Sequence, residues 1–115
     1  MLNEKYSINV KTEEKEIDMV IRGSFTKEDV MSFVTDYNQS LQPIETNDFT
    51  LNVDCTTMNI ITQDMIPDLE NSFSLYGQAH FKKIVFIIVK SPVIKMQLNR
   101  VAKHAGLNNF EFVQK

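Results

Sequence analysis

Only a few residues in this sequence have the types and spacing that enzymes use for chemistry. Cys55 follows Asp54 at the end of an alternating apolar run, and the chain has two histidines, His80 and His104. A thiol beside a histidine could act as a nucleophile. Cys55, however, is in phase with three apolar residues that indicate the inward face of a strand, Phe49, Leu51 and Val53. We therefore expect a buried and inert thiol.

Other catalytic patterns have no better support. Asp54 and Asp64 could form a carboxylate pair, but nothing in the sequence fixes their separation. One cysteine and two histidines give no zinc-binding pattern, and a chain with three glycines has neither a G-x-G-x-x-G motif nor a P-loop. The sequence therefore predicts a protein that is not an enzyme and that has no metal site and no cofactor.

Size and charge exclude further classes of function. A chain of 115 residues is long enough for a single domain, residues 1–115, and its net charge of −3 argues against a face that binds nucleic acid. The longest apolar run, 84–89, is far shorter than a membrane span, and the first ten residues contain no secretory signal. With one cysteine, a reducing, cytoplasmic location is expected.

Alternating or continuous apolar runs predict strands that are joined by helices. The predicted strands lie at 6–11, 17–23, 49–55, 84–89 and 110–113. The first two form an antiparallel hairpin, and each later strand follows an amphipathic helix, so the element order is β-β-α-β-α-β-α-β. Strands that are joined through helices pair in parallel with right-handed crossovers. The sequence predicts an α/β fold, a single layered domain with a mixed, mostly parallel sheet, in which the wholly apolar strand 84–89 is covered on both faces.

Capping residues set the expected ends of two helices. Thr26 and Asp29 form a capping box at the start of the first helix. The third helix is capped by Ser91, and Gly106 closes it in the left-handed conformation.

The start of the second helix depends on Pro67, which is tolerated only in the first helical turn. Asp64 as the N-cap satisfies this condition, with Gln63 as the other candidate, and Gly77 is expected to close the helix in the left-handed conformation. The buried side of this helix is expected to hold Met65, Ile66, Leu69, Phe73 and Tyr76.

Three segments of the chain are similar to motifs of the STAS domain, the fold of bacterial anti-sigma factor antagonists. They are IRGSF, LNVDCTTMNIITQDMI and SPVIKMQL with HAGL after it. They resemble the family's L-x-G-x-(L/F) opening, its strand and turn vvlDls-x-v-x-x-iDSSGlg, and its third helix nP-x-v-x-x-x-l…sGL, in the same order. The resemblance extends from about Ile17 to Val113. It implies a STAS-like fold and a partner-facing turn between the third strand and the second helix.

This turn departs from the family pattern. The family's DSSG falls on Thr62, Gln63, Asp64 and Met65. The serine that a partner kinase phosphorylates in that family corresponds to Gln63, which has no hydroxyl group, while Thr62 remains a neighbouring hydroxyl. Asp64 places a fixed negative charge near that position. Two interpretations stay open: a permanently biased regulatory switch, or an aspartate that only caps the helix.

The resemblance implies a non-enzymatic regulatory module that docks on other proteins through this turn. The partner would be a regulator or kinase-like protein, or a second copy of the chain in a homodimer. The residues expected to contact it are Met58, Ile60, Ile61, Met65 and Asp68. The alternative is a STAS-like carrier or sensor of a small apolar ligand or lipid, which a closed apolar cavity near Met65 and Met96 would favour.

Overall fold

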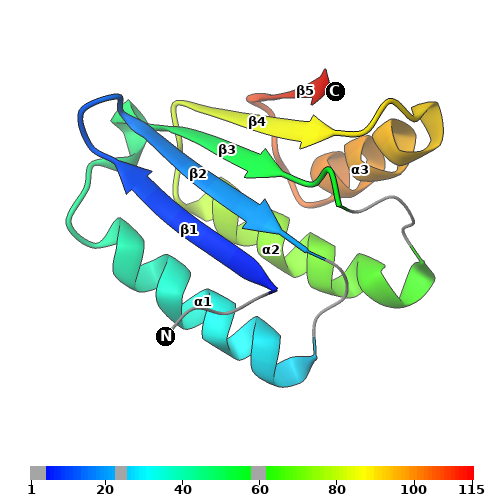
Figure 1. Cartoon of the computed structure of the whole chain (residues 1–115), viewed down its shortest axis with the longest axis horizontal. Coiled ribbons are helices and arrows are strands. Elements are labelled where there is room, and N and C mark those ends of the chain that lie inside the picture. The colour runs from blue at the N-terminus through cyan, green and yellow to red at the C-terminus, as the bar shows by residue number, and fades with distance from the viewer. Residues whose placement is uncertain (1–4, 23–25, 58–61) are drawn as a thin grey trace.

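The computed structural model describes residues 5–22, 26–57 and 62–115. Within these residues the chain forms a five-stranded sheet with the strand order β1-β2-β3-β4-β5 (Figure 1). β1 is antiparallel to β2, and all other neighbours are parallel. The strands are β1 (Tyr6–Lys11), β2 (Glu16–Ile21), β3 (Thr50–Asp54), β4 (Lys83–Ile88) and β5 (Phe110–Gln114), and the α-helices are α1 (Lys27–Leu41), α2 (Ile66–Gln78) and α3 (Pro92–His104). The predicted α/β order and mixed, mostly parallel sheet are confirmed.

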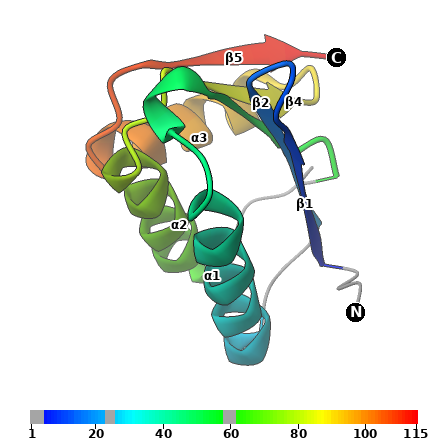
Figure 2. The same ribbon diagram turned by 90° about the vertical axis from the view of Figure 1, so that its left-hand side faces the viewer.

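All three of these α-helices lie on one face of the sheet (Figures 1 and 2). The strand order follows the sequence, so every βαβ crossover steps in the same direction along the sheet. Because such crossovers are right-handed, helices that step in one direction are placed on one side. The prediction that the strand at 84–89 is covered on both faces is therefore wrong, since the described elements leave one face of β4 open.

Alternate residues of each strand point toward the helices and form the core. Leu51, Phe86 and Ile88 have no exposed surface. The ring of Phe73 on α2 lies 4.7 Å from that of Phe86, measured between centroids. The sheet and α2 are therefore joined through apolar and aromatic contacts, which supply most of the free energy that holds such a layer in place.

The opposite face of the sheet is largely polar. The amide of Asn52 donates hydrogen bonds to Glu16 at 2.8 Å and to Asp18 at 3.0 Å, and Lys11 forms an ion pair with Asp18 at 2.8 Å. Polar and apolar residues alternate along β2 and β3 because one set of side chains faces the helices and the other faces water.

The predicted start of α1 and both predicted ends of α3 are confirmed. The amide of Thr26 donates to the Asp29 carboxylate at 2.9 Å, and the amide of Asp29 donates to the Thr26 hydroxyl at 3.2 Å. Ser91 accepts a hydrogen bond from the amide of Ile94 at 3.2 Å, and Gly106 has a φ of 89°. No helix in the described ranges is long and apolar enough to cross a membrane.

Both predicted ends of α2 need correction. A short 3-10 turn, η2 (Gln63–Met65), precedes the helix and has Thr62 at its own N-cap. The N-cap of α2 is Met65, not Asp64 or Gln63. Pro67 still falls in the first turn of α2, where it breaks no helical hydrogen bond. Gly77 lies inside the helix, where a Cβ atom would be 3.2 Å from Leu107. The left-handed residue after the end of α2 is His80, with a φ of 57°. The small size of Gly77 thus permits close packing rather than a left-handed turn.

Substitutions at two neighbouring isoleucines of β4 test whether helices cover only one face of the sheet. Ile88 points into the core with no exposed surface, whereas Ile87 is half-buried on the open face. We expect Ile88→Ala to lower the free energy of unfolding by about 3–4 kcal/mol and Ile87→Ala by about 1 kcal/mol, because only the first leaves a closed cavity. Urea denaturation of both variants measures the difference. Equal losses would contradict an open face.

Candidate functional site

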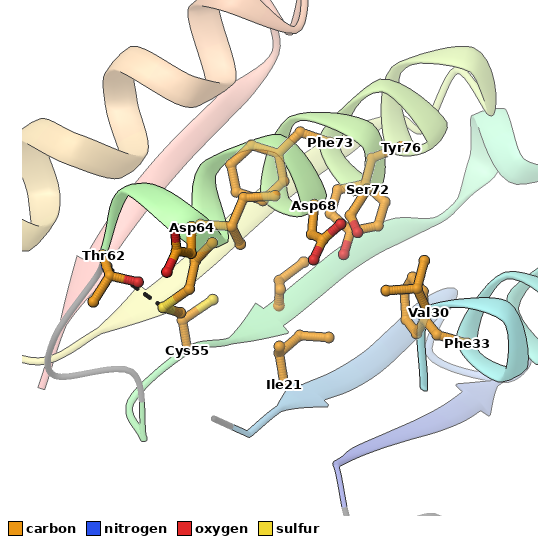
Figure 3. Close-up of a pocket in the computed structure, with 13 residues that line it drawn as sticks. Ile21, Val30, Phe33, Cys55, Thr62, Asp64, Asp68, Ser72, Phe73 and Tyr76 are labelled. Carbon is orange, nitrogen blue, oxygen red and sulfur yellow. Dashed lines mark hydrogen bonds between the residues drawn. The ribbon is translucent and has the colours of Figure 1, made fainter. Parts of the chain in front are cut away.

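The ends of β2 and β3 and the start of α2 surround a cavity of about 270 Å³ that is partly open to solvent (Figure 3). Its position follows from the fold, because the carboxyl ends of parallel strands and the helix that follows them face a common crevice. The cavity extends to α1, which contributes Val30 and Phe33. Two helices and two strands, joined through loops that are distant in sequence, therefore share one site.

The floor of the cavity is apolar. Ile21 comes from β2, Val53 and Cys55 come from β3 and the residue after it, and the rest of the floor is formed by α2 side chains, Leu69, Phe73 and Tyr76. Each of these residues is buried in the core. Water in contact with such a floor makes few hydrogen bonds, so an apolar group can displace it favourably.

One wall of the cavity is polar and acidic. Thr62, Asp64, Asp68 and Ser72 line this wall, all from η2 and the first half of α2 or the residue before them. Figure 3 shows the carboxylate of Asp68 and the hydroxyl of Ser72 projecting from the same side of α2 into the space in front of it. Asp68 and Ser72 are four residues apart on a helix, which puts their side chains on one face.

The 3-10 turn η2 shapes the edge of this wall. The amide of Met65 donates to the carbonyl oxygen of Thr62 at 3.1 Å, and the amide of Thr62 donates to the sulfur of Met65 at 3.5 Å. Met65 is thereby folded back over the turn and is half-buried beside the cavity. Asp64 lies within the turn rather than at an N-cap, so the interpretation that it only caps the helix loses its geometric basis.

Cys55 is buried, as predicted, with 2% of its surface exposed. Burial, with a smaller effect from the charge of Asp54, raises the pKa of the Cys55 thiol to about 12. Asp54 itself accepts hydrogen bonds from the amide and the hydroxyl of Thr56, at 2.9 and 2.6 Å. The thiol is therefore protonated near neutral pH, and the aspartate beside it is engaged elsewhere.

The histidines do not complete a catalytic or metal-binding group. His104 lies 3.2 Å from Glu70 on the outside of α2 and α3, and His80 is exposed after the end of α2. The described residues contain no group of three histidine, cysteine, aspartate or glutamate side chains that could hold a metal ion.

The structure brings together four of the residues that sequence reasoning selected. Thr62, Asp64, Met65 and Asp68 all line the cavity, whereas Gln63 is exposed and does not. Met58, Ile60 and Ile61 lie outside the described residues. A cavity near Met65 and Met96 was the observation that would favour the ligand-binding alternative, but Met96 is 54% exposed on α3 and is not part of the lining.

Several lining residues were not selected from the sequence, notably Ser72, Ile21 and the two α1 residues Val30 and Phe33. Ser72 gave a usable signal: it lies four residues after Asp68, on the same helical face, beside the buried stripe. Val30 and Phe33 belong to an apolar stripe at helical spacing, and such a stripe is the same whether its residues fill a core or border a cavity.

The fold of the chain is similar to that of a known structure. The crystal structure is that of an uncharacterized protein from the DUF3478 family with a SpoIIAA-like fold, from Shewanella loihica PV-4. The TM-score is 0.69, and the match covers 98% of this chain and 90% of that one. This chain has a SpoIIAA-like fold. The fold that the STAS resemblance implied is thereby confirmed.

The similarity to known proteins concerns the fold alone. Sequence identity to the Shewanella protein is 18%, so the likeness concerns the fold and not the activity. No protein-family model matches the chain, and a search of curated proteins gives no match.

The raised pKa of Cys55 predicts slow thiol chemistry in the folded protein. A rise in pKa from 9.0 to about 12 lowers the thiolate fraction at pH 8 about a thousandfold. We expect the folded protein to react with a disulfide reagent at least that much more slowly than the chain in urea. Equal rates in the two states would contradict a buried thiol.

The same group predicts a loss of stability in alkali. Between pH 9 and about 12 the unfolded chain releases the Cys55 proton that the folded chain keeps, so the free energy of unfolding falls as the pH rises through this range. The raised pKa values of Tyr37 and Tyr76, which are also caused by burial, act in the same direction. Urea denaturation should give a shallower alkaline decline for Cys55→Ala than for the wild type, and identical slopes would contradict the assignment.

Proposed function

We propose that this protein is a non-enzymatic binding module that holds a small, largely apolar molecule in the cavity between β2, β3, α1 and α2. The observation that carries the proposal is the cavity itself, with a volume of about 270 Å³ above an apolar floor. A cavity of 150 Å³ accommodates benzene, so this volume corresponds to a ligand of about ten non-hydrogen atoms. The proposal favours the carrier or sensor alternative over docking alone.

The residues of the site support binding rather than catalysis. The Cys55 thiol has a pKa of about 12 and is therefore not a nucleophile near neutral pH. The hydroxyls of Thr62 and Ser72 line the cavity, but neither histidine lies among the lining residues to activate them. A reducing, cytoplasmic setting, proposed from the lone cysteine, is compatible with this unreactive thiol.

A pair of leucine substitutions tests the proposal. Ser72→Leu places an apolar side chain in the cavity, and Asn71→Leu adds the same side chain at the neighbouring exposed position of α2. With the neutral probe 2-phenylethanol, followed by NMR titration, we expect binding at submillimolar to millimolar concentration to the wild type and to Asn71→Leu. Ser72→Leu should weaken binding at least tenfold, because the space is filled.

The free energy of unfolding of each variant shows whether a loss of binding is caused by the filled cavity or by unfolding. A leucine that fills an existing cavity should leave the free energy of unfolding unchanged or raise it, since it adds contacts without displacing neighbours. Unchanged binding of 2-phenylethanol to folded Ser72→Leu, or the absence of any binding to the wild type, would overturn the proposal.

A second candidate function is docking on another protein through the turn before α2. Thr62, Gln63, Asp64, Pro67 and Asp68 are exposed, which supports their availability to a partner. Three of them also border the cavity, so ligand occupancy and partner binding would involve the same segment. The partner would be a regulator or kinase-like protein, or a second copy of the chain. Phosphorylation at Gln63 is excluded by its side chain.

Two arginine substitutions on glutamines test docking separately from ligand binding. Gln63 lies in the exposed turn and Gln78 at the opposite end of α2, and neither lines the cavity. We expect Gln63→Arg to reduce partner capture from the native cell, or self-association measured by light scattering, at least tenfold, and Gln78→Arg to have no effect. Both variants should bind 2-phenylethanol like the wild type. Equal capture by both variants would contradict docking through this turn.

A further inference from the structure

The charged side chains of the cavity all lie on one wall, and they are all acidic. Asp64 and Asp68 are the ionisable groups of its polar wall, and no lysine, arginine or histidine stands among the described residues that line it. The internal segments outside the description, 23–25 and 58–61, contain no charged residue in their sequences. The charge that a ligand meets at this wall is therefore negative.

We infer that the ligand of this cavity carries a cationic head group, a primary amine or a similar ammonium, which pairs with Asp68 and Ser72 while its apolar body lies on the floor. This inference rests on the proposed function, because it names the class of molecule that the cavity would take. Asp64, at the edge of the wall, adds to the negative potential around the head group.

The two carboxylates are not neutralised within the described part of the protein. Neither Asp64 nor Asp68 has an ion pair or a side-chain hydrogen bond to another described residue. Other acidic residues of the same chain do have such partners: Asp18 pairs with Lys11, and Glu111 pairs with Lys83. Asp64 and Asp68 are thus the acidic groups that a bound cation could satisfy at this site.

The dipole of α2 offsets only part of this charge. The N-terminus of a helix corresponds to roughly half a positive charge, against two full negative charges on Asp64 and Asp68. A carboxylate or phosphate head group would face net repulsion at the wall, although a helix N-terminus alone would have attracted it. The acidic residues therefore reverse the preference that the backbone would otherwise give.

The hydrogen-bonding groups also match an ammonium. A primary ammonium has three N–H donors and no acceptor. The wall offers acceptors in the carboxylate of Asp68 and the hydroxyl of Ser72, which project together in Figure 3, and water can satisfy the remaining donor at the open side. Below them, the rings of Phe33, Phe73 and Tyr76 line the space, and aromatic faces attract cations and pack well against aromatic or aliphatic bodies.

The test uses three probes of matching size that differ in the head group: 2-phenylethylamine, 2-phenylethanol and phenylacetate. At pH 7 and low ionic strength, NMR titration of the wild type should give binding of the amine about two- to fivefold tighter than that of the alcohol, a size typical of exposed charge pairs. Phenylacetate should bind more weakly than the alcohol. Raising the salt concentration should reduce the amine preference, because exposed charges are screened.

Variants that remove one negative charge show which carboxylate causes the preference for the amine over the alcohol. Asp68→Asn should lower the ratio of amine to alcohol affinity most, Asp64→Asn should lower it less, and the double variant should bring it close to one. Asp48→Asn removes the same charge from the exposed turn η1 (Thr46–Asp48), before the opposite end of β3, and should leave the ratio unchanged. The affinity for 2-phenylethanol should be unchanged in Asp48→Asn, and in the other three variants it should change less than the affinity for the amine.

The outcomes separate this inference from the proposed function. If the wild type binds the alcohol or phenylacetate as tightly as the amine, or if the double variant keeps the amine preference, the cationic head group is wrong while the cavity remains a binding site. If Asp48→Asn lowers the ratio as much as Asp68→Asn, the effect is one of net charge and the inference also fails. If none of the probes binds, both the proposed function and the inference are overturned.

Discussion

The one-sided cover of the sheet is the constraint from which the rest of this structure follows. Strands β2 to β5 are laid down in sequence order, and right-handed crossovers then place α1, α2 and α3 on the same face. One face of every strand must be apolar and the other can be polar, as the Asn52 hydrogen bonds to Glu16 and Asp18 illustrate. The same arrangement leaves the carboxyl ends of β2 and β3 beneath two neighbouring helices, and the cavity lies there.

The cavity combines features that normally occur apart. Its floor consists of core residues such as Val53 and Phe73, which stabilise the fold. Its wall includes Asp64 and Asp68, which have no ion pair or side-chain hydrogen bond to another residue that the structure describes. A substitution in the floor would therefore change stability and binding together, whereas a substitution in the wall would change binding alone. This division makes the wall the informative part of the site.

Sequence reasoning recovered the fold because its signals are local. The capping box of Thr26 and Asp29 and the punctuation of α3 by Ser91 and Gly106 depend on neighbouring residues, and the structure confirms both. The start of α2 was missed because Pro67 is compatible with several starting points, and only the 3-10 geometry of η2 distinguishes them. The open face of β4 was missed because a continuous apolar run fits one covered face as well as two.

The site was only partly predictable for a different reason. Asp64 and Asp68 stood out in the sequence because they lie at a strand-to-helix turn, where side chains from several elements converge. A cavity, however, is space that side chains leave unfilled, and its size depends on how far apart α1 and α2 are held. No pattern in the sequence encodes that separation, so Phe33 and Tyr76 were expected only as core residues.

The contact between α1 and α2 at the inner end of the cavity has a consequence for ligand length. The Tyr37 hydroxyl donates a hydrogen bond to the carbonyl oxygen of Leu75 at 3.3 Å, and the rings of Tyr37 and Tyr76 lie 5.8 Å apart between centroids. The two helices therefore contact each other one helical turn beyond Phe33, and neither Tyr37 nor Leu75 is among the residues that line the cavity. We infer that the cavity ends before this contact. In a series of ligands with longer and longer alkyl chains, each added methylene group would therefore extend toward solvent instead of deeper into the protein. Affinity would stop rising with chain length once the inner end of the cavity was filled.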